Sequence, residues 1–138
     1  MDRHGNGRLQ PTKGDPVYAH HLQWCWFVVA TFARPLGEIV NHRRAFEPEI
    51  GDVVAEKKGR ATACVAALDV ALSDRTYLLG DTLSGVDLSF NYVMRSYRRM
   101  VSEALPANFQ TYVDRVTALP SYEATVKADV ETGERLNG

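Results

Sequence analysis

Apolar residues recur along this chain at steps of three and four, the spacing that places side chains on one face of an α-helix. A first long helix is expected to start at Asp15 and Pro16, because aspartate can cap free N–H groups and proline needs no N–H at the first helical position. Pro35 should kink this helix or end it near Arg34, since its ring crowds the preceding turn. The predicted buried stripe of this first helix is Leu22, Cys25, Val29, Phe32, Leu36 and Val40.

A second helix is predicted from about Asp52 to Ser73, after the segment 47–51, which contains a proline and a glycine, has interrupted the pattern. The first two helices should pack antiparallel because the connection between them is short. The predicted buried stripe of the second helix is Ala61, Cys64, Val65, Leu68 and Leu72.

The later part of the chain predicts one helix directly after Ser84, one from near Pro106 and a shorter one from near Pro120, with 132–138 as a frayed tail. The residues expected to point inward from these helices are Phe90, Val93, Met94, Tyr97, Phe109, Val113, Val116, Tyr122 and Val126. No segment has the pattern of a strand. The predicted fold class is therefore all-α, a helical bundle of about five helices.

The turn before the third of these helices has the strongest local signal. Ser84 and Asp87 are spaced for a capping box, in which each side chain bonds the other residue's backbone N–H. Leu83 and Leu88 flank the box at the spacing of a hydrophobic staple. A serine nucleophile with an aspartate base is the alternative, but the cap explains both residues, so we assign them a structural role.

Composition narrows the function classes. The chain is 45% hydrophobic, and its 16 Lys and Arg nearly balance 17 Asp and Glu, which favours neither a disordered chain nor a nucleic-acid partner. The longest apolar stretch, 24–33, is shorter than the roughly 18 residues of a membrane span, and the polar start of the chain does not resemble a secretory signal. We therefore expect a soluble, cytoplasmic protein without membrane or nucleic-acid partners.

Metal and thiol chemistry are not expected. Cys25 and Cys64 fall on buried stripes and suit a reducing compartment, where they serve core packing. The four histidines form no pair at helical ligand spacing, so no metal site is predicted. Arg95, Arg98 and Arg99 are typical of a solvated helix face, although one of them could meet a carboxylate across a cleft.

A family resemblance rests on motifs spread along the chain. Gly7-Arg8-Leu9, Gly14-Asp15-Pro16 and Leu22-Gln23-Trp24 resemble the linker and first long helix of bacterial glutathione transferases. The segment 75–88 with its capping box resembles the family's C-terminal motif, and 119–122 its approach to the last helix. The resemblance implies that 1–14 is a linker or remnant of a preceding domain, 15–131 the glutathione transferase C-terminal-like helical domain and 132–138 a tail.

The resemblance also implies which domain of such an enzyme contains which part of the active site. In this family the thioredoxin-like N-terminal domain carries most of the glutathione site and the residue that acts on the thiol, and that domain is expected to be absent from this chain. No catalytic residue is therefore assigned, and glutathione, the co-substrate of the full-length family, is not expected to bind this chain alone. The helical domain would supply a wall of the electrophile pocket, for which the candidates are Phe27, Ala30, Thr31 and Arg34. Some bacterial relatives have histidine or lysine near the positions of Ala30 and Thr31.

Two functions remain open. One is the helical half of a detoxifying glutathione transferase, inactive as an isolated chain and completed by a thioredoxin-like domain or partner chain. The other is a non-catalytic interaction module of the same fold. The family implies a homodimer formed partly through the first two helices, and because Trp24, Trp26 and Phe27 are adjacent, at least one should face a partner or ligand. Met1 could be an artificial boundary, an internal start or the start of a shortened gene.

Overall fold

The computed structural model describes residues 7–101 and 103–137, and the regular elements of this part are all helical. In chain order they are α1 (Tyr18–Trp26), the π-helix η1 (Phe27–Phe32), α2 (Ala33–Ala45), α3 (Gly51–Ala71), α4 (Gly85–Met100), α5 (Ala107–Thr117) and α6 (Pro120–Asn137). Because α1, η1 and α2 form one continuous run, the described residues contain five long helices, which confirms the predicted all-α bundle. Their single extended pairing is an isolated bridge between Tyr77 and Gly80.

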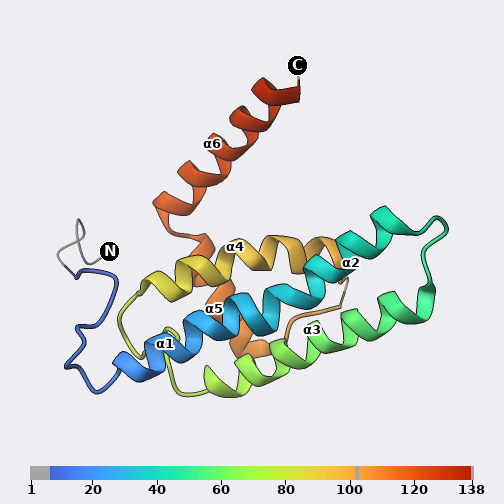
Figure 1. Ribbon diagram of the computed structural model, residues 1–138. Coiled ribbons are helices and arrows are strands. Elements are labelled where there is room, and N and C mark those ends of the chain that lie inside the picture. Colours follow the sequence, from blue (N-terminus) through green and yellow to red (C-terminus); the bar gives the residue numbers. More distant parts are fainter. Residues whose placement is uncertain (1–6, 102, 138) are drawn as a thin grey trace.

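The helices are arranged around the long first run (Figure 1). α3 returns antiparallel along one side of it, as the short connection predicted, and α4 lies along the other side. α5 crosses behind and packs on α3 and α4, while α6 packs against α5 and projects away from the bundle. None of the helices in the described ranges is long and apolar enough to cross a membrane.

The first run differs from its prediction in start and register. The helix begins at Tyr18, and Asp15 accepts a 2.9 Å hydrogen bond from the Val17 N–H just before it. Leu22 and Val29, predicted to be buried, are exposed, whereas Val28 is buried. The buried residues His21, Val28, Phe32, Leu36 and Ile39 of the run follow one another at steps of seven, four, four and three, so the inward face lies one position earlier than predicted at Leu22, Val29 and Val40.

Pro35 does not end this run but lies in the first turn of α2, directly after the π-helix η1. In an α-helix its nitrogen would face the carbonyl of Thr31, to which it cannot donate, and its ring would crowd that carbonyl. The π-helix lies directly before it, with the N–H of Ala33 bonded to the Val28 carbonyl five residues back. The Cys64 thiol of α3 lies 4.0 Å from the Thr31 carbonyl oxygen. The widened turns therefore accommodate the proline without ending the helix.

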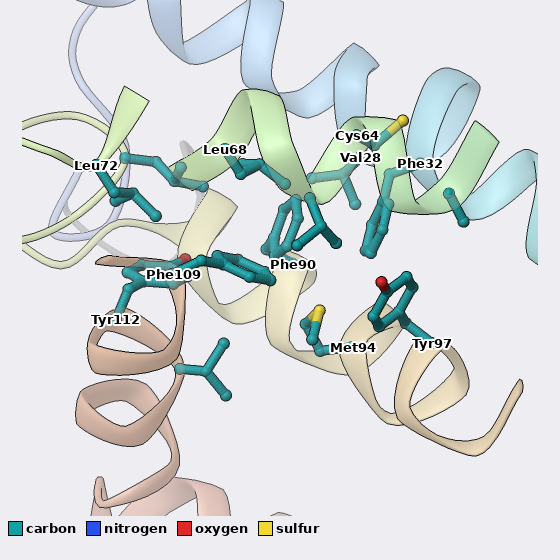
Figure 2. Close-up of a cluster of buried hydrophobic side chains, with 14 of the residues drawn as sticks. Val28, Phe32, Cys64, Leu68, Leu72, Phe90, Met94, Tyr97, Phe109 and Tyr112 are labelled. Atoms are coloured by element: carbon teal, nitrogen blue, oxygen red, sulfur yellow. The ribbon is translucent and has the colours of Figure 1, made fainter. Parts of the chain in front are cut away.

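The core is an aromatic stack at the crossing of the run with α3, α4 and α5. Figure 2 shows Phe90 of α4 between Phe32 and Phe109. The ring centroids of Phe32 and Phe90 are 4.9 Å apart in a stacked arrangement, and those of Phe90 and Phe109 are 5.8 Å apart edge to face. Tyr97 and Tyr112 extend the stack at its two ends. All five rings are at most 2% exposed, so this stack fixes the relative placement of the three elements that carry them, η1, α4 and α5.

The turn before α4 contains the capping box between Ser84 and Asp87. The Ser84 N–H and hydroxyl donate to Asp87 Oδ2 at 2.8 and 2.7 Å. Asp87 Oδ1 accepts from the Leu78 N–H at 3.0 Å and from the Tyr112 hydroxyl at 2.9 Å. This fully buried carboxylate thus joins the preceding turn, α4 and α5. Because its hydrogen bonds explain why it is buried, a structural role accounts for Asp87.

The other predictions for the C-terminal half have mixed outcomes. Leu83 lies beside the N-terminal loop, and Leu88 is exposed in a groove toward α6, so the staple stays a prediction. α6 is longer than α5 rather than shorter, and it runs to Asn137 through the segment predicted as a frayed tail. The helix continues there because the segment holds no proline and its single glycine within the helix weakens it without ending it.

Candidate functional site

The first run presents an apolar strip that nothing in the described chain covers. Leu22, Trp26 and Val29 follow one another at steps of four and three on α1 and η1. Their exposed fractions are 43%, 68% and 59%. Trp26 is therefore the outward-facing aromatic of the adjacent set, while Trp24 and Phe27 pack against the core. An exposed apolar strip of this kind is typical of a docking surface.

A shallow groove continues from this strip between α2 and α4. It has a volume of about 210 Å³ and an opening toward solvent, and Tyr92 stands at its α4 edge. Its walls are almost entirely apolar or small, so it can receive an apolar group but offers few polar contacts for orienting one. The lining residues are Ala33, Leu36, Gly37, Val40, Tyr92, Val93, Ser96 and Met100.

The four predicted pocket residues lie on η1 and at the start of α2, and none of them lines that groove. Phe27 is half-buried and meets Trp24 edge to face, with ring centroids 5.4 Å apart. Ala30 and Thr31 are exposed. Arg34 donates to Glu38 at 2.9 Å. The structure thus keeps the four together on one stretch of helix, and their role in substrate binding stays a prediction.

Arg34 belongs to an ion-pair network between α2 and α3. Glu38 pairs with Lys57 at 3.2 Å as well as with Arg34, and the pKa of Glu38 is lowered mainly by its hydrogen bond from Arg34. The Arg34 side chain is 68% exposed, so this attraction is screened by water and adds little to stability. Because the guanidinium is exposed, it can exchange Glu38 for an anionic ligand at small cost.

One pair on α1 was not anticipated from the sequence. The Cys25 thiol lies 3.7 Å from His21 Nε2, four residues earlier, and Nδ1 of the buried His21 has no hydrogen-bond partner within the described part of the chain. Burial raises the pKa of Cys25, so the thiol stays protonated and is a poor nucleophile near neutral pH. The sequence signal for this contact was the i,i+4 spacing of His21 and Cys25, because a histidine and a cysteine four residues apart on a helix lie as close together as two histidines do.

The remaining candidates for thiol or metal chemistry are Cys64 and the potential metal-ligating side chains. Burial also raises the pKa of Cys64, the second free cysteine. Within residues 7–101 and 103–137, no group of three or more His, Cys, Asp and Glu side chains is arranged to hold a metal ion. The site that the geometry offers is therefore a binding surface, made of the apolar strip and the α2/α4 groove.

Comparison with known proteins identifies the fold of this chain. Residues 36–120 match the family described as "Glutathione S-transferase, C-terminal domain", which is more than half of the chain. Among curated proteins, no sequence matches.

Several solved structures share the fold. A glutathione S-transferase from Actinobacillus pleuropneumoniae has a TM-score of 0.73 at 20% identity, with 93% of this chain and 59% of that chain covered. A glutathione transferase from Phanerochaete chrysosporium, solved with oxidized glutathione, has a TM-score of 0.82 at 16% identity, with coverages of 94% and 60%. A sphingomonad glutathione S-transferase, solved with glutathione, has a TM-score of 0.76 at 17% identity, with coverages of 92% and 61%. The chain thus spans about three fifths of the length of each of these structures.

Proposed function

The chain belongs to the glutathione S-transferase C-terminal domain family, and from this premise we propose that it is the helical half of a glutathione-conjugating enzyme. The observation that carries the proposal is the exposed strip of Leu22, Trp26 and Val29, which is apolar, continuous and without a partner in the described residues. A thioredoxin-like domain is the partner that we propose for this strip. Burying the three side chains would contribute about 1.5–3 kcal/mol for each fully covered one.

In the completed enzyme the partner domain would bind glutathione and favour its thiolate. The sulfur would then form a bond to the electrophilic carbon of an apolar substrate, and the leaving group would depart with its electron pair. This chain would contribute proximity, by holding the apolar part of the electrophile beside the thiolate. Phe27, Ala30, Thr31 and Arg34 are the residues that we propose for this wall, where the exposed Arg34 would exchange Glu38 for an anionic group of the substrate.

Association and location follow from the same proposal. We propose a homodimer formed partly through the first run and α3, and the outer face of α3 carries small residues such as Ala63 and Ala67. Exposed small residues allow two helical pairs to approach closely. Two free cysteines suit the reducing cytoplasm, where conjugation would serve detoxification.

The test compares the chain alone with the chain fused to a thioredoxin-like domain from a glutathione transferase. Turnover of glutathione with 1-chloro-2,4-dinitrobenzene is expected for the fusion and not for the chain alone. Trp26→Ser should weaken the gain in thermal stability that the fused domain gives, because it removes the most exposed aromatic of the strip. Phe46→Ser is the matched control, since Phe46 is a half-exposed aromatic on the α2–α3 connection.

The same experiment distinguishes the proposed enzyme from the alternative, a non-catalytic interaction module. Stable association through the strip without turnover of the fusion would favour the module. Retention of the isolated chain on immobilised glutathione would contradict the proposal that glutathione binding needs the partner domain.

A further inference from the structure

The His21 and Cys25 pair brings two metal-ligating side chains together on α1. They lie one helical turn apart, and the Cys25 sulfur is 3.7 Å from Nε2 of His21. His21 is only 5% exposed, so its ring is held in place by its surroundings. Cys25 is half-buried, so its sulfur lies near the surface of the helix. Neither residue belongs to the exposed strip or lines the α2/α4 groove.

The separation of these two atoms is that of two ligands on one metal ion. A zinc ion lies about 2.3 Å from a thiolate sulfur and about 2.0–2.1 Å from an imidazole nitrogen, usually in tetrahedral geometry. Two ligands at these distances and at a tetrahedral angle are about 3.6 Å apart. The 3.7 Å between Cys25 Sγ and His21 Nε2 is close to this value. One ion can therefore contact both atoms with little movement of either side chain.

The imidazole of His21 has few other polar contacts. Nδ1 is buried and has no hydrogen-bond partner among the described residues, and Nε2 has only the weak contact to sulfur. Buried polar atoms are normally satisfied, so the packing of the described chain does not account for this histidine. An ion at Nε2 would replace the weak contact with a ligand bond. The neutral ring would then carry its proton on Nδ1, and this unpaired donor limits the affinity.

We propose that His21 Nε2 and Cys25 Sγ together bind a thiophilic divalent cation such as Zn²⁺ or Cd²⁺. Sulfur and imidazole ligands favour such ions, whereas Mg²⁺ and Ca²⁺ prefer oxygen ligands. No group of three His, Cys, Asp and Glu side chains forms a complete set within the described ranges, so water fills the remaining positions and the site is open. The site is independent of the glutathione chemistry proposed above.

Binding exchanges a proton for the ion without any change of oxidation state. The S–H bond of Cys25 breaks, the proton goes to solvent, and the sulfur electron pair forms the bond to the metal. Burial raises the pKa of Cys25, so the proton competes with the ion throughout the neutral range. The affinity should therefore rise about tenfold for each unit of pH between about pH 7 and 8.

The test is titration of the whole reduced chain with Cd²⁺, followed by the ultraviolet absorption of the cadmium–thiolate bond. We expect saturable binding of one ion per chain, with a dissociation constant between about 1 and 200 µM at about pH 7.5, because two protein ligands supply roughly half the binding free energy of a four-ligand zinc site. Millimolar Mg²⁺ should not compete. The nitrogen NMR signal of His21 Nε2 should shift as Cd²⁺ is added.

The chain offers a matched control for each ligand. Cys25→Ala should remove the absorption, whereas Cys64→Ala should retain it, because Cys64 is the other free cysteine and lies on α3. His21→Gln should weaken Cd²⁺ binding about tenfold or more, since only the thiolate then remains. His20→Gln changes the exposed neighbouring histidine and should leave the affinity unchanged.

Three results would overturn the proposal. The first is no saturable cadmium–thiolate absorption at millimolar Cd²⁺. The second is an equal loss of absorption in Cys25→Ala and Cys64→Ala. The third is an unchanged nitrogen signal of His21 Nε2 at saturating Cd²⁺, a measurement on the unchanged chain that holds even if His21→Gln fails to fold.

Discussion

Asp87 belongs to a local capping motif and also makes hydrogen bonds to residues farther away along the chain. The sequence indicates its capping box with Ser84, because both residues lie within four positions of each other. It does not indicate that the same carboxylate accepts from Leu78 and from Tyr112, since those contacts depend on how the turn and α5 pack against α4. The helix cap is thus also the main polar connection between three parts of the bundle.

Replacing Asp87 should therefore cost more than the loss of a helix cap. Asp87→Ala would leave four donor groups without their acceptor in a buried site, and we expect the free energy of unfolding to fall by about 3 kcal/mol or more. Asp81→Ala is the control in the same turn, because Asp81 is exposed and accepts from Thr76. It should cost less than about 1 kcal/mol in urea denaturation. Equal losses for the two variants would contradict the central role of Asp87.

Tyr112 makes the stability of the fold sensitive to alkaline pH. Burial, and next the neighbouring Asp87 carboxylate, raise the pKa of Tyr112 well above its ordinary value. Above pH ~10 the unfolded chain releases this proton while the folded chain retains it, so stability is full below that pH and falls as the pH rises further. Tyr112→Phe should give a shallower loss of stability between about pH 10 and 11, measured by urea denaturation at each pH. A loss of stability as steep in the Tyr112→Phe variant as in the unchanged chain would contradict this assignment.

At the scale of elements, the sequence predicts where helices occur better than which face of each helix points into the core. The start of α4 and the breaks around α3 follow from nearby residues, and the structure has them close to the predicted positions. The inward stripe of the first run does not follow, because several apolar residues in succession leave more than one helical face that could be buried. An error of one position placed Leu22 and Val29 in the predicted core, so the sequence indicated an outward aromatic but not the exposed strip that Leu22 and Val29 form with Trp26.

The start of α5 gives an element-scale prediction. α5 has no side-chain cap of its own at Pro106, and Asp69 of α3 accepts from the Phe109 N–H at 2.9 Å instead. Asp69→Ala should lower the free energy of unfolding by about 1–2 kcal/mol, as for the loss of an ordinary helix cap. Asp74→Ala, at a side chain that is 76% exposed, should cost less than about 0.5 kcal/mol. If Asp69→Ala were as mild as Asp74→Ala in urea denaturation, the cap would not contribute to stability.

At the scale of the whole molecule, the core and the candidate binding surfaces lie largely on different faces of the helices. The buried cluster draws on η1, α2, α3, α4, α5 and the turn before α4, and none of the α6 side chains that the structure describes belongs to it. The apolar strip and the α2/α4 groove are built on the outer faces of the run and α4. The sequence could indicate the composition of these surfaces but not their neighbours, because Arg95 and Asp129 meet only after α6 has packed on α5.

α6 should consequently open without unfolding the rest of the bundle. It packs mainly against the end of α5, and its ion pair from Asp129 to Arg95 is partly exposed and worth under about 1 kcal/mol. In hydrogen exchange, amides of α6 should exchange through local opening with a free energy well below that of global unfolding, whereas amides near Phe90 in α4 should require global unfolding. Protection of α6 equal to that of α4 would contradict this division.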